Sequence, residues 1–297
     1  MGAATRDAFG EAILEAGQDE RVVVLTGDLR DSTRTEAFAE RYPERFFDAG
    51  IAESSMVGVA AGLALSGKIP WACSFSCFVT GRFETIRVSV AYQEANVRIV
   101  GTHSGIGVGE DGYSQMAQED IAGLRALPNM AILNPADAAE TKRAVRYLVE
   151  HEGPAFLRLT RQGVEDVTPE DDRFDFGRIA TLREGGDVAI IGTGATVAEA
   201  MKAADILEGD GISARVLNAH TLKPFDEDAV RALAAEIGRI VTVEDHSVIG
   251  DGGGARLHVI GTRAFGESGS PAELYDKHGL SGPRVAETTR SFLRSTS

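Results

Sequence analysis

Short apolar runs alternate with helix-like segments along the first half of the chain. The runs are continuous rather than alternating, which is typical of strands buried on both faces of a parallel sheet. They predict strands at residues 22–25, 70–75, 97–100, 130–133 and 155–159. The intervening spacing predicts helices at residues 4–17, 53–66, 81–92, 117–126 and 137–150. Strands that alternate with helices in this way predict a doubly wound parallel sheet.

A second alternation follows an acidic stretch. Residues 163–177 are rich in acidic side chains and contain Pro169, which is typical of a linker, and we place the linker itself at residues 166–177. Beyond it the pattern predicts strands at 188–191, 214–217 and 240–243, and helices at 195–208, 226–236, 253–264 and 284–295. The predicted fold class is α/β, with one doubly wound domain at residues 1–165 and a second at residues 178–297.

Composition narrows the function classes. The 297 residues carry a formal net charge of −15, which argues against binding to nucleic acid or to anionic membrane surfaces. No apolar run is long enough to span a bilayer, and the first residues lack the apolar core of a signal peptide. Two cysteines are too few for a disulfide framework. We therefore expect a cytoplasmic protein.

Glu53 is the only ionisable residue between Asp48 and Lys68, and it opens a predicted helix of small apolar residues. Such a helix allows close approach of another backbone. One interpretation is a first-turn acid stabilised by the helix dipole. The other is a functional acid in an apolar pocket, where desolvation favours the protonated form. The local sequence does not separate the two.

The segment from Asp48 to Glu53 reads Asp-Ala-Gly-Ile-Ala-Glu and resembles the matching D-x-G-I-A-E segment of transketolases and 1-deoxyxylulose-5-phosphate synthases. Further motifs follow in the family's order, namely Gly67-Lys68-Ile69-Pro70, Thr102 to Gly112 and Thr160-Arg161-Gln162. The resemblance covers nearly the whole chain but only the back half of a full-length transketolase. It implies a pyrimidine-binding domain followed by a transketolase C-terminal domain, in an enzyme that depends on thiamine diphosphate.

The resemblance assigns four residues to the cofactor. It implies that Glu53 is the catalytic acid, which hydrogen-bonds N1′ of the aminopyrimidine and stabilises its imino tautomer. Phe75 and Phe78, in Ser-Phe-Ser-Cys-Phe, match aromatic residues that flank the pyrimidine ring, although Phe is most often simply core. Asp28 matches an aspartate near the thiazolium.

The resemblance also assigns residues to a sugar phosphate substrate. His103 matches a residue near the phosphate, and Asp111 matches one that contacts a substrate hydroxyl. Arg161, Arg6 and Ser32 match positions that hold the phosphate, and an arginine suits bidentate phosphate binding. A single arginine would ordinarily be a surface charge.

Gln115 is a departure from the family, because transketolases carry a histidine near this position, where it contacts the ketose end of the donor. Glutamine hydrogen-bonds but carries no proton. Ser54 and Ser55 also depart from the usual residues after the glutamate. These changes bear on the donor substrate rather than on the catalytic acid.

Glycine clusters elsewhere carry weak signals. The segment Gly192-Thr193-Gly194 lacks the third glycine of a dinucleotide fingerprint and is predicted to be a plain strand-to-helix turn. Gly250-Asp251-Gly252 and Gly209-Asp210-Gly211 resemble the start of the Gly-Asp-Gly…Asn motif that binds Mg²⁺ and diphosphate, but no suitable asparagine follows either one. We therefore expect no metal ligands in this chain and expect them on a partner subunit.

The resulting hypothesis is the C-terminal subunit of a split transketolase. It predicts transfer of a two-carbon ketol unit from a phosphorylated ketose to an aldose. The expected partner is an N-terminal transketolase subunit with the diphosphate and Mg²⁺ site, in an α2β2 heterotetramer. Alternatives are a subunit similar to 1-deoxyxylulose-5-phosphate synthase or to the E1β subunit of 2-oxoacid dehydrogenases, and a non-catalytic regulatory partner.

Overall fold

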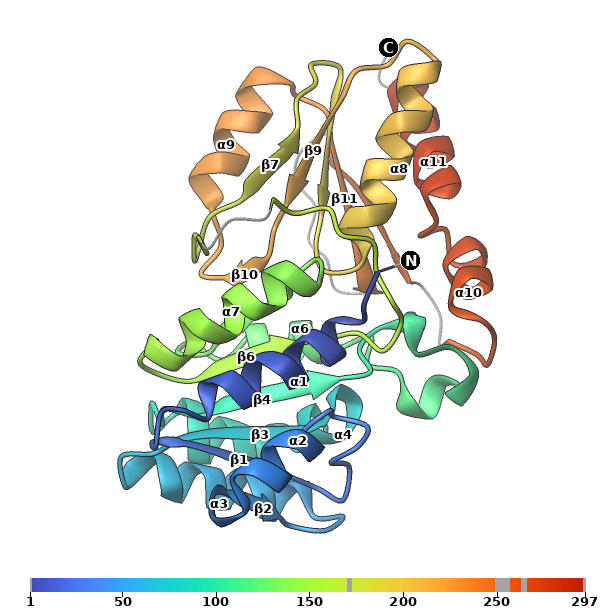
Figure 1. Ribbon diagram of the computed structural model, residues 1–297. Coiled ribbons are helices and arrows are strands. Elements are labelled where there is room, and N and C mark those ends of the chain that lie inside the picture. Colours follow the sequence, from blue (N-terminus) through green and yellow to red (C-terminus); the bar gives the residue numbers. More distant parts are fainter. Residues whose placement is uncertain (1, 170–172, 249–256, 263–265, 296–297) are drawn as a thin grey trace.

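The computed structural model describes residues 2–169, 173–248, 257–262 and 266–295, which form two α/β layers stacked one above the other (Figure 1). The lower layer contains a seven-stranded sheet with the order β10-β5-β6-β4-β3-β1-β2. The upper layer contains a five-stranded sheet with the order β12-β11-β8-β9-β7. The predicted α/β class is confirmed.

Six strands of the first sheet run parallel to one another. They are β1 (Val22–Thr26), β2 (Phe46–Asp48), β3 (Ile69–Phe75), β4 (Arg98–Thr102), β5 (Ala131–Leu133) and β6 (Ala155–Arg158). Successive residues of a strand point to opposite faces, so Val23 and Leu25 enter one core while Val22 and Val24 enter another. Both faces are therefore covered, as the continuous apolar runs predict.

The helices of this layer divide between the two faces. The helices α1 (Thr5–Ala16), α2 (Glu36–Arg41) and α7 (Ala138–Glu150) cover the face that carries Val22, whereas α3 (Glu53–Leu65), the π-helical turn η2 (Ile86–Ala91) and α6 (Asp120–Arg125) cover the other. The short helices α4 (Ser76–Thr80) and α5 (Phe83–Thr85) follow β3. The 3₁₀ segments are η1 (Pro43–Arg45), η3 (Ile106–Asp111) and η4 (Tyr113–Gln115).

The second sheet is parallel in its centre. Its strands are β7 (Ala180–Arg183), β8 (Val188–Gly192), β9 (Ala214–Asn218), β11 (Ile240–Ser247) and β12 (Leu257–Thr262). The helices α8 (Thr196–Gly209), α10 (Pro271–Lys277) and α11 (Gly282–Ser295) pack on one face, and α9 (Glu227–Glu236) packs on the other. Gly192-Thr193-Gly194 forms the predicted strand-to-helix turn between β8 and α8.

Two edge strands, which the sequence did not predict, run antiparallel to their neighbours. The strand β10 (Thr221–Lys223) follows β9 in the chain but pairs antiparallel with β5, so it belongs to the first sheet. The strand β7 pairs antiparallel with β9. Both lie at sheet edges and have only three or four residues, which are too few to show a periodic pattern in the sequence.

Some predicted helices are wrong. Residues 257–262, within the predicted helix 253–264, form β12 beside β11, because Val259 and Ile260 suit a strand and the parallel partner is available. The predicted helix 81–92 is divided into α5 and the π-helical η2, and the predicted helix 117–126 begins only at Asp120. The segment Gly250-Asp251-Gly252, noted above for its resemblance to the start of a diphosphate-binding motif, lies outside the described residues.

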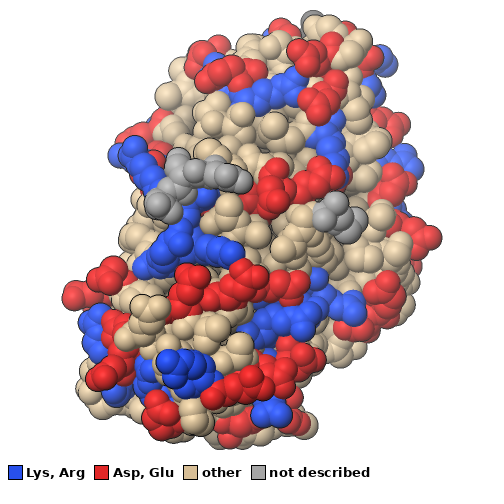
Figure 2. Space-filling model, in the orientation of Figure 1, with Lys and Arg blue, Asp and Glu red and all other residues tan. Residues whose placement is uncertain are grey.

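On the face shown in Figure 2, acidic and basic side chains are interspersed, so the surplus acidic charge forms no single extended patch there. Among the described residues, no helix is both long and apolar enough to cross a bilayer.

Candidate functional site

The carboxyl ends of the central strands in the first sheet gather the candidate residues at one edge. Phe75 ends β3, His103 follows β4, and Arg161 follows β6, while Glu53 opens the helix after β2. Backbone strain concentrates at the same edge, because Asp28, Arg34 and His103 all have positive φ without being glycine. Such outliers cluster at functional sites, so this edge is the candidate site.

Glu53 is buried, with 5% of its surface exposed. Within the described part of the chain, its carboxylate has neither a hydrogen bond nor an ion pair. Gly27, at the end of β1, lies directly beside it, since a Cβ atom there would stand 3.5 Å from Glu53 Oε1. The Glu53 oxygens are not among the side-chain atoms that are sealed from solvent without a partner, so the carboxylate reaches solvent at this sheet edge and is open to a ligand.

Three rings stack on one another at the sheet edge that also carries Glu53. The Phe75 ring is buried between two others, with centroids 5.3 Å from Phe78 and 3.6 Å from His103, and both contacts are nearly parallel. Phe78, on α4, is the half-buried outer ring. Phe78 is therefore the ring with a face left for a ligand, whereas Phe75 supports it from behind.

The hydrogen bonds of His103 define its tautomer. Arg6 Nη1 lies 3.0 Å from His103 Nε2, and a guanidinium can only donate, so Nε2 is the acceptor. The proton is therefore on Nδ1, which donates to Thr102 Oγ1 at 2.9 Å. Burial, together with the positive charges of Arg6, Arg161 and Arg34, lowers the pKa of His103 to about 3. The imidazole is neutral at physiological pH.

Two arginines surround the imidazole. Arg6 also donates to the main-chain oxygen of Ser32 at 3.2 Å, which brings Ser32 to the same corner, and its Nε is buried without a hydrogen bond among the described residues. Burial lowers the pKa of Arg6, with Arg34 adding to the effect. Arg161 Nη1 lies 3.3 Å from Glu110, and Arg161 Nη2 lies 3.9 Å from Asp111. This corner is suited to an anion.

The remaining candidates lie at the edges of this arrangement. Asp28 is exposed, and its side chain makes no hydrogen bond or ion pair within the described residues. Gln115 is half-buried in η4, and its Nε2 lies 3.2 Å from Ser114 Oγ. The structure thus gathers Phe75, Phe78, His103, Arg6 and Ser32 by direct contacts, whereas Glu53 and Asp28 stand on the other side of β3.

Three contributors were missed from sequence. Asp48 accepts hydrogen bonds from the backbone amides of Asp28 and Gly50, both at 2.9 Å, so it joins the two loops beside Glu53. Arg34 pairs with Asp7 at 2.6 Å and adds positive charge near His103. Asp245, from the second domain, accepts from the amide of Ile106 in the glycine-rich loop. Only Asp48 had a signal, its place at the start of the quoted motif.

No group of three or more His, Cys, Asp or Glu in the described ranges is arranged to hold a metal ion. Neither thiol is reactive by its surroundings, because burial raises the pKa of Cys77 to about 12 and that of Cys73 further.

Both halves of the chain match known protein families. Residues 1–166 match the transketolase pyrimidine-binding domain, and residues 177–285 match the transketolase C-terminal domain. A 6-deoxy-6-sulfo-D-fructose transketolase subunit of Clostridium sp. is 40% identical, over 94% of this chain and 91% of its own. An apulose-4-phosphate transketolase subunit of Phocaeicola vulgatus is 37% identical, over 98% of each.

A solved structure described as a split gene transketolase, inactive beta4 tetramer, has 42% identity and a TM-score of 0.90, with 99% of both chains covered. Together these matches cover both domains and nearly the full length of the split subunits. The chain therefore belongs to the transketolase family, in which it corresponds to the C-terminal subunit of a split transketolase.

Proposed function

We propose that this subunit completes a transketolase that transfers a two-carbon ketol unit from an anionic ketose, most simply a phosphorylated one, to an aldose. The observation that carries the proposal is Glu53, a largely buried residue whose carboxylate stays open to solvent and has no partner within the described residues. Across β3 from it lies the corner formed by Arg6, His103 and Arg161. An acid for the cofactor and a cationic corner for the far end of the sugar thus share one sheet edge.

The residues beside Glu53 fit the aminopyrimidine of thiamine diphosphate. The Glu53 carboxyl is free to hydrogen-bond a ring nitrogen, and Phe78 offers an aromatic face at the same sheet edge. When bound, the cofactor supplies a nucleophilic carbanion for ketol transfer. Glu53 would hold the proton at N1′, and Asp48 would keep the loops of Asp28 and Gly50 in place. We propose that the partner subunit holds Mg²⁺ and the diphosphate.

The cationic corner suits the phosphate of a sugar. Arg6, Arg161 and the neutral His103 would contact its oxygens, with Ser32 beside them. Asp111 lies next to Arg161 and would accept a hydrogen bond from a substrate hydroxyl. Gln115 would hydrogen-bond the ketose end without transferring a proton.

A partner is supported by the surface around α3. Seven large apolar side chains among the described residues are exposed, and we call this set the α3 face. They are Phe47 on β2, Ile51 before α3, Val59 and Leu65 on α3, Phe83 on α5, Val88 in η2 and Tyr92 directly after η2. Apolar residues gathered in this way mark protein interfaces. We propose that an N-terminal subunit and a second copy of this chain cover the α3 face in an α2β2 assembly.

The central test uses Glu53→Gln in the assembled complex. We expect exchange of the cofactor's C2 hydrogen for deuterium to slow by roughly 10²–10⁴, because the amide cannot hold the proton at N1′. The matched control is Glu36→Gln, which changes a first-turn acid of α2 in the same way. Measuring exchange at saturating thiamine diphosphate separates activation of the cofactor from substrate binding.

A first-turn acid that only stabilises its helix would lose about 0.3–1 kcal/mol of stability and no exchange rate. If Glu53→Gln exchanges the C2 hydrogen as fast as Glu36→Gln does, the assignment of Glu53 is wrong.

A further inference from the structure

The glycine-rich loop that carries His103 and Asp111 is packed mainly against the second domain. Ile106, Val108 and Met116 lie in the same hydrophobic core as β8, β11 and α8, rather than in either core of the first sheet. The segment η3 lies against α10, as Figure 1 also shows at the boundary of the two layers. The second domain therefore holds a loop that belongs to the site of the first.

The place where η3 docks has a topological meaning. In the second sheet β8 lies between β9 and β11, so the chain leaves β8 toward one side and returns to its other side. Open α/β sheets of this kind bind ligands outside the carboxyl ends of the strands at such a switch point. Here the carboxyl end of β11 meets the protein's own loop, so the loop occupies a position that other folds of this class give to a ligand.

One carboxylate makes the contact. Asp245, in β11, is buried, and its Oδ1 accepts a hydrogen bond from the amide of Ile106 at 2.8 Å. Gly105, with φ of 74°, lies so close that a Cβ atom on it would collide with the Asp245 carboxylate. The glycine at this point of the loop is thus explained by a side chain of the second domain.

A tyrosine extends the contact to the other side of the loop. The buried hydroxyl of Tyr275, on α10, donates to Asp245 Oδ2 at 3.0 Å and accepts from Gln162 Nε2 at 3.0 Å. Burial beside the Asp245 carboxylate raises the pKa of Tyr275 well above its ordinary value, so the hydroxyl keeps its proton and donates. Gln162 lies against Gly107 and directly follows Arg161. The pair therefore reaches both the loop and the arginine's segment.

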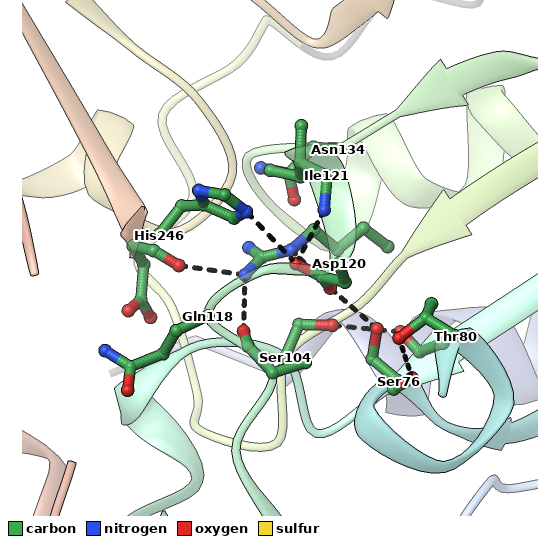
Figure 3. Close-up of polar contacts among 12 residues, drawn as sticks. Ser76, Thr80, Ser104, Gln118, Asp120, Ile121, Asn134 and His246 are labelled. Atoms are coloured by element: carbon green, nitrogen blue, oxygen red, sulfur yellow. Dashed lines mark hydrogen bonds and ion pairs between the residues drawn. The ribbon is translucent and has the colours of Figure 1, made fainter. Parts of the chain in front are cut away.

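A buried cluster, whose members Asp120 and Ser76 are labelled in Figure 3, also holds the backbone of Asp245. Arg158, at the end of β6, donates to the main-chain oxygen of Asp245 at 2.8 Å and pairs with Asp120 at 2.9 Å. Asp120 also accepts from Ser76 Oγ at 2.6 Å, at the start of the helix that carries Phe78. Burial would raise the pKa of Asp120, but Arg158 holds it below its ordinary value. Loop, helix and second domain thus meet at Asp245.

We infer that Asp245 and Tyr275 are positioning residues of the second domain, which fix the 103–112 loop so that His103 and Asp111 face the substrate together with Arg161. The inference rests on the proposed function for the identity of the substrate, and on the contacts alone for the anchoring of the loop. It gives the C-terminal domain a part in substrate recognition through the loop that this domain holds. The other buried groups of the cluster support this arrangement without touching the loop's tip.

The test compares Tyr275→Phe with Tyr147→Phe in the complex with the N-terminal subunit. Tyr275→Phe keeps the ring and removes only the bridging hydroxyl, while Tyr147 of α7, whose hydroxyl lies 3.3 Å from His151 Nδ1, is a matched control away from the loop. We expect amide hydrogen exchange of residues 104–112 to quicken at least about tenfold in Tyr275→Phe alone. We also expect KM for ribose 5-phosphate to rise roughly fivefold or more relative to KM for ribose, because a displaced loop no longer holds His103 in position beside the phosphate.

Asp245→Asn is the second variant, because it keeps an acceptor for Ile106 and loses the acceptor for Tyr275; the same pattern is expected. Unchanged exchange in both variants overturns the inference, and so does faster exchange with an unchanged ratio of the two KM values, which is the result of a purely structural contact. A wild-type complex that uses both aldoses equally well overturns the proposed phosphate role of Arg6, His103 and Arg161, and the exchange measurement then still decides whether the loop is anchored by these residues.

Discussion

His103 shows how much the charge state of one residue governs the candidate site. Its Nε2 accepts from Arg6, so in the free protein the lone pair that would face a substrate is already engaged. A fully ionised phosphate accepts hydrogen bonds and has none to donate, so a contact with His103 would need a proton on Nε2. A phosphate that contacts His103 would therefore require Arg6 to turn toward the anion and His103 to change its tautomer or gain a proton.

The first residue-scale prediction concerns this proton. In the isolated chain without phosphate, ¹⁵N NMR of His103 is expected to show a neutral ring protonated at Nδ1 from pH 8 down to pH 5, because its pKa is lowered to about 3. Arg6→Gln should raise that pKa, since it removes a nearby positive charge, whereas Arg231→Gln on α9 should not. A ring that titrates between pH 6 and 7 in the wild type would contradict the assignment.

The second residue-scale prediction concerns the anion. Arg161→Ala should weaken phosphorylated substrates by roughly 1.5–3 kcal/mol, or about 10- to 150-fold in KM, because a charge-assisted hydrogen bond is lost. Arg231→Ala, which removes an exposed arginine on α9, is the control. Steady-state kinetics with phosphorylated, sulfonated and neutral sugars would show which anion the corner prefers, and equal losses for charged and neutral sugars would exclude an anion role for Arg161.

Sequence predicted the candidate residues here because each belongs to a local motif. The contacts that join them were not predictable in the same way, since Arg34 and Asp245 are distant in the chain from the groups they influence. A positive φ at Arg34 or His103 also leaves no mark in the residue type, because it is imposed by the surrounding structure.

The helix α3 joins the site to the surface. Its buried side carries Met56, Val57 and Ala60, whereas Gly58 and Gly62 are exposed and have open space where a Cβ would stand. Its opposite faces are thus almost equally apolar, as in a helix that is buried on all sides. The open side is part of the α3 face, which we propose is covered in the assembly.

At this scale we predict opposite effects of one substitution. Gly58→Leu should raise the stability of the isolated chain by up to about 1 kcal/mol, because glycine is unfavourable within a helix and no atom blocks the new side chain. The same change should abolish assembly with the partner, measured by sedimentation velocity. Gly209→Leu, at the exposed end of α8, is the control for the residue type. A Gly58→Leu chain that assembles normally would place the interface elsewhere.

Elements with a clear local signal were predicted well, for example the continuous apolar run of β1, the small apolar residues of α3 and the amphipathic pattern of α7. Those that depend on a distant partner were not. The strand β10 has only three residues and is defined by pairing with β5, and β12 is defined by its place beside β11. In residues 81–92 the β-branched side chains Ile86, Val88 and Val90 accompany a π-helical turn, which a simple 3.6-residue period does not reveal.

On the scale of the whole molecule, the contact between the domains contains a buried acid besides Asp245. Glu140, on α7, accepts from the amide of Ala136 at 2.7 Å and from Asn218 Nδ2, at the end of β9, at 2.9 and 3.0 Å. Burial raises the pKa of Glu140 to about 7. The protonated form is therefore favoured in the folded chain, and the ordinary value of about 4.5 applies when the chain unfolds.

The whole-molecule prediction follows from the sign of this shift. A raised folded-state pKa adds stability that is complete below about pH 4.5 and is lost as pH rises through about 7. From pH 5 to pH 8, the free energy of unfolding of the wild type should therefore fall relative to that of Glu140→Gln, by at most roughly 3 kcal/mol. Urea unfolding of both proteins across this range measures the difference. Parallel pH profiles would show that Glu140 titrates normally in the fold.

The position of β10 also bears on how the chain is made. During synthesis β7, β8, α8 and β9 leave the ribosome before Thr221–Lys223 does. One edge of β5 therefore stays unpaired while half of the second domain is being synthesised. An unpaired strand edge is a template for pairing with other chains. A nascent chain stalled before Thr221 is thus expected to need chaperones most, and a fragment cut at the linker should aggregate rather than persist as a free domain.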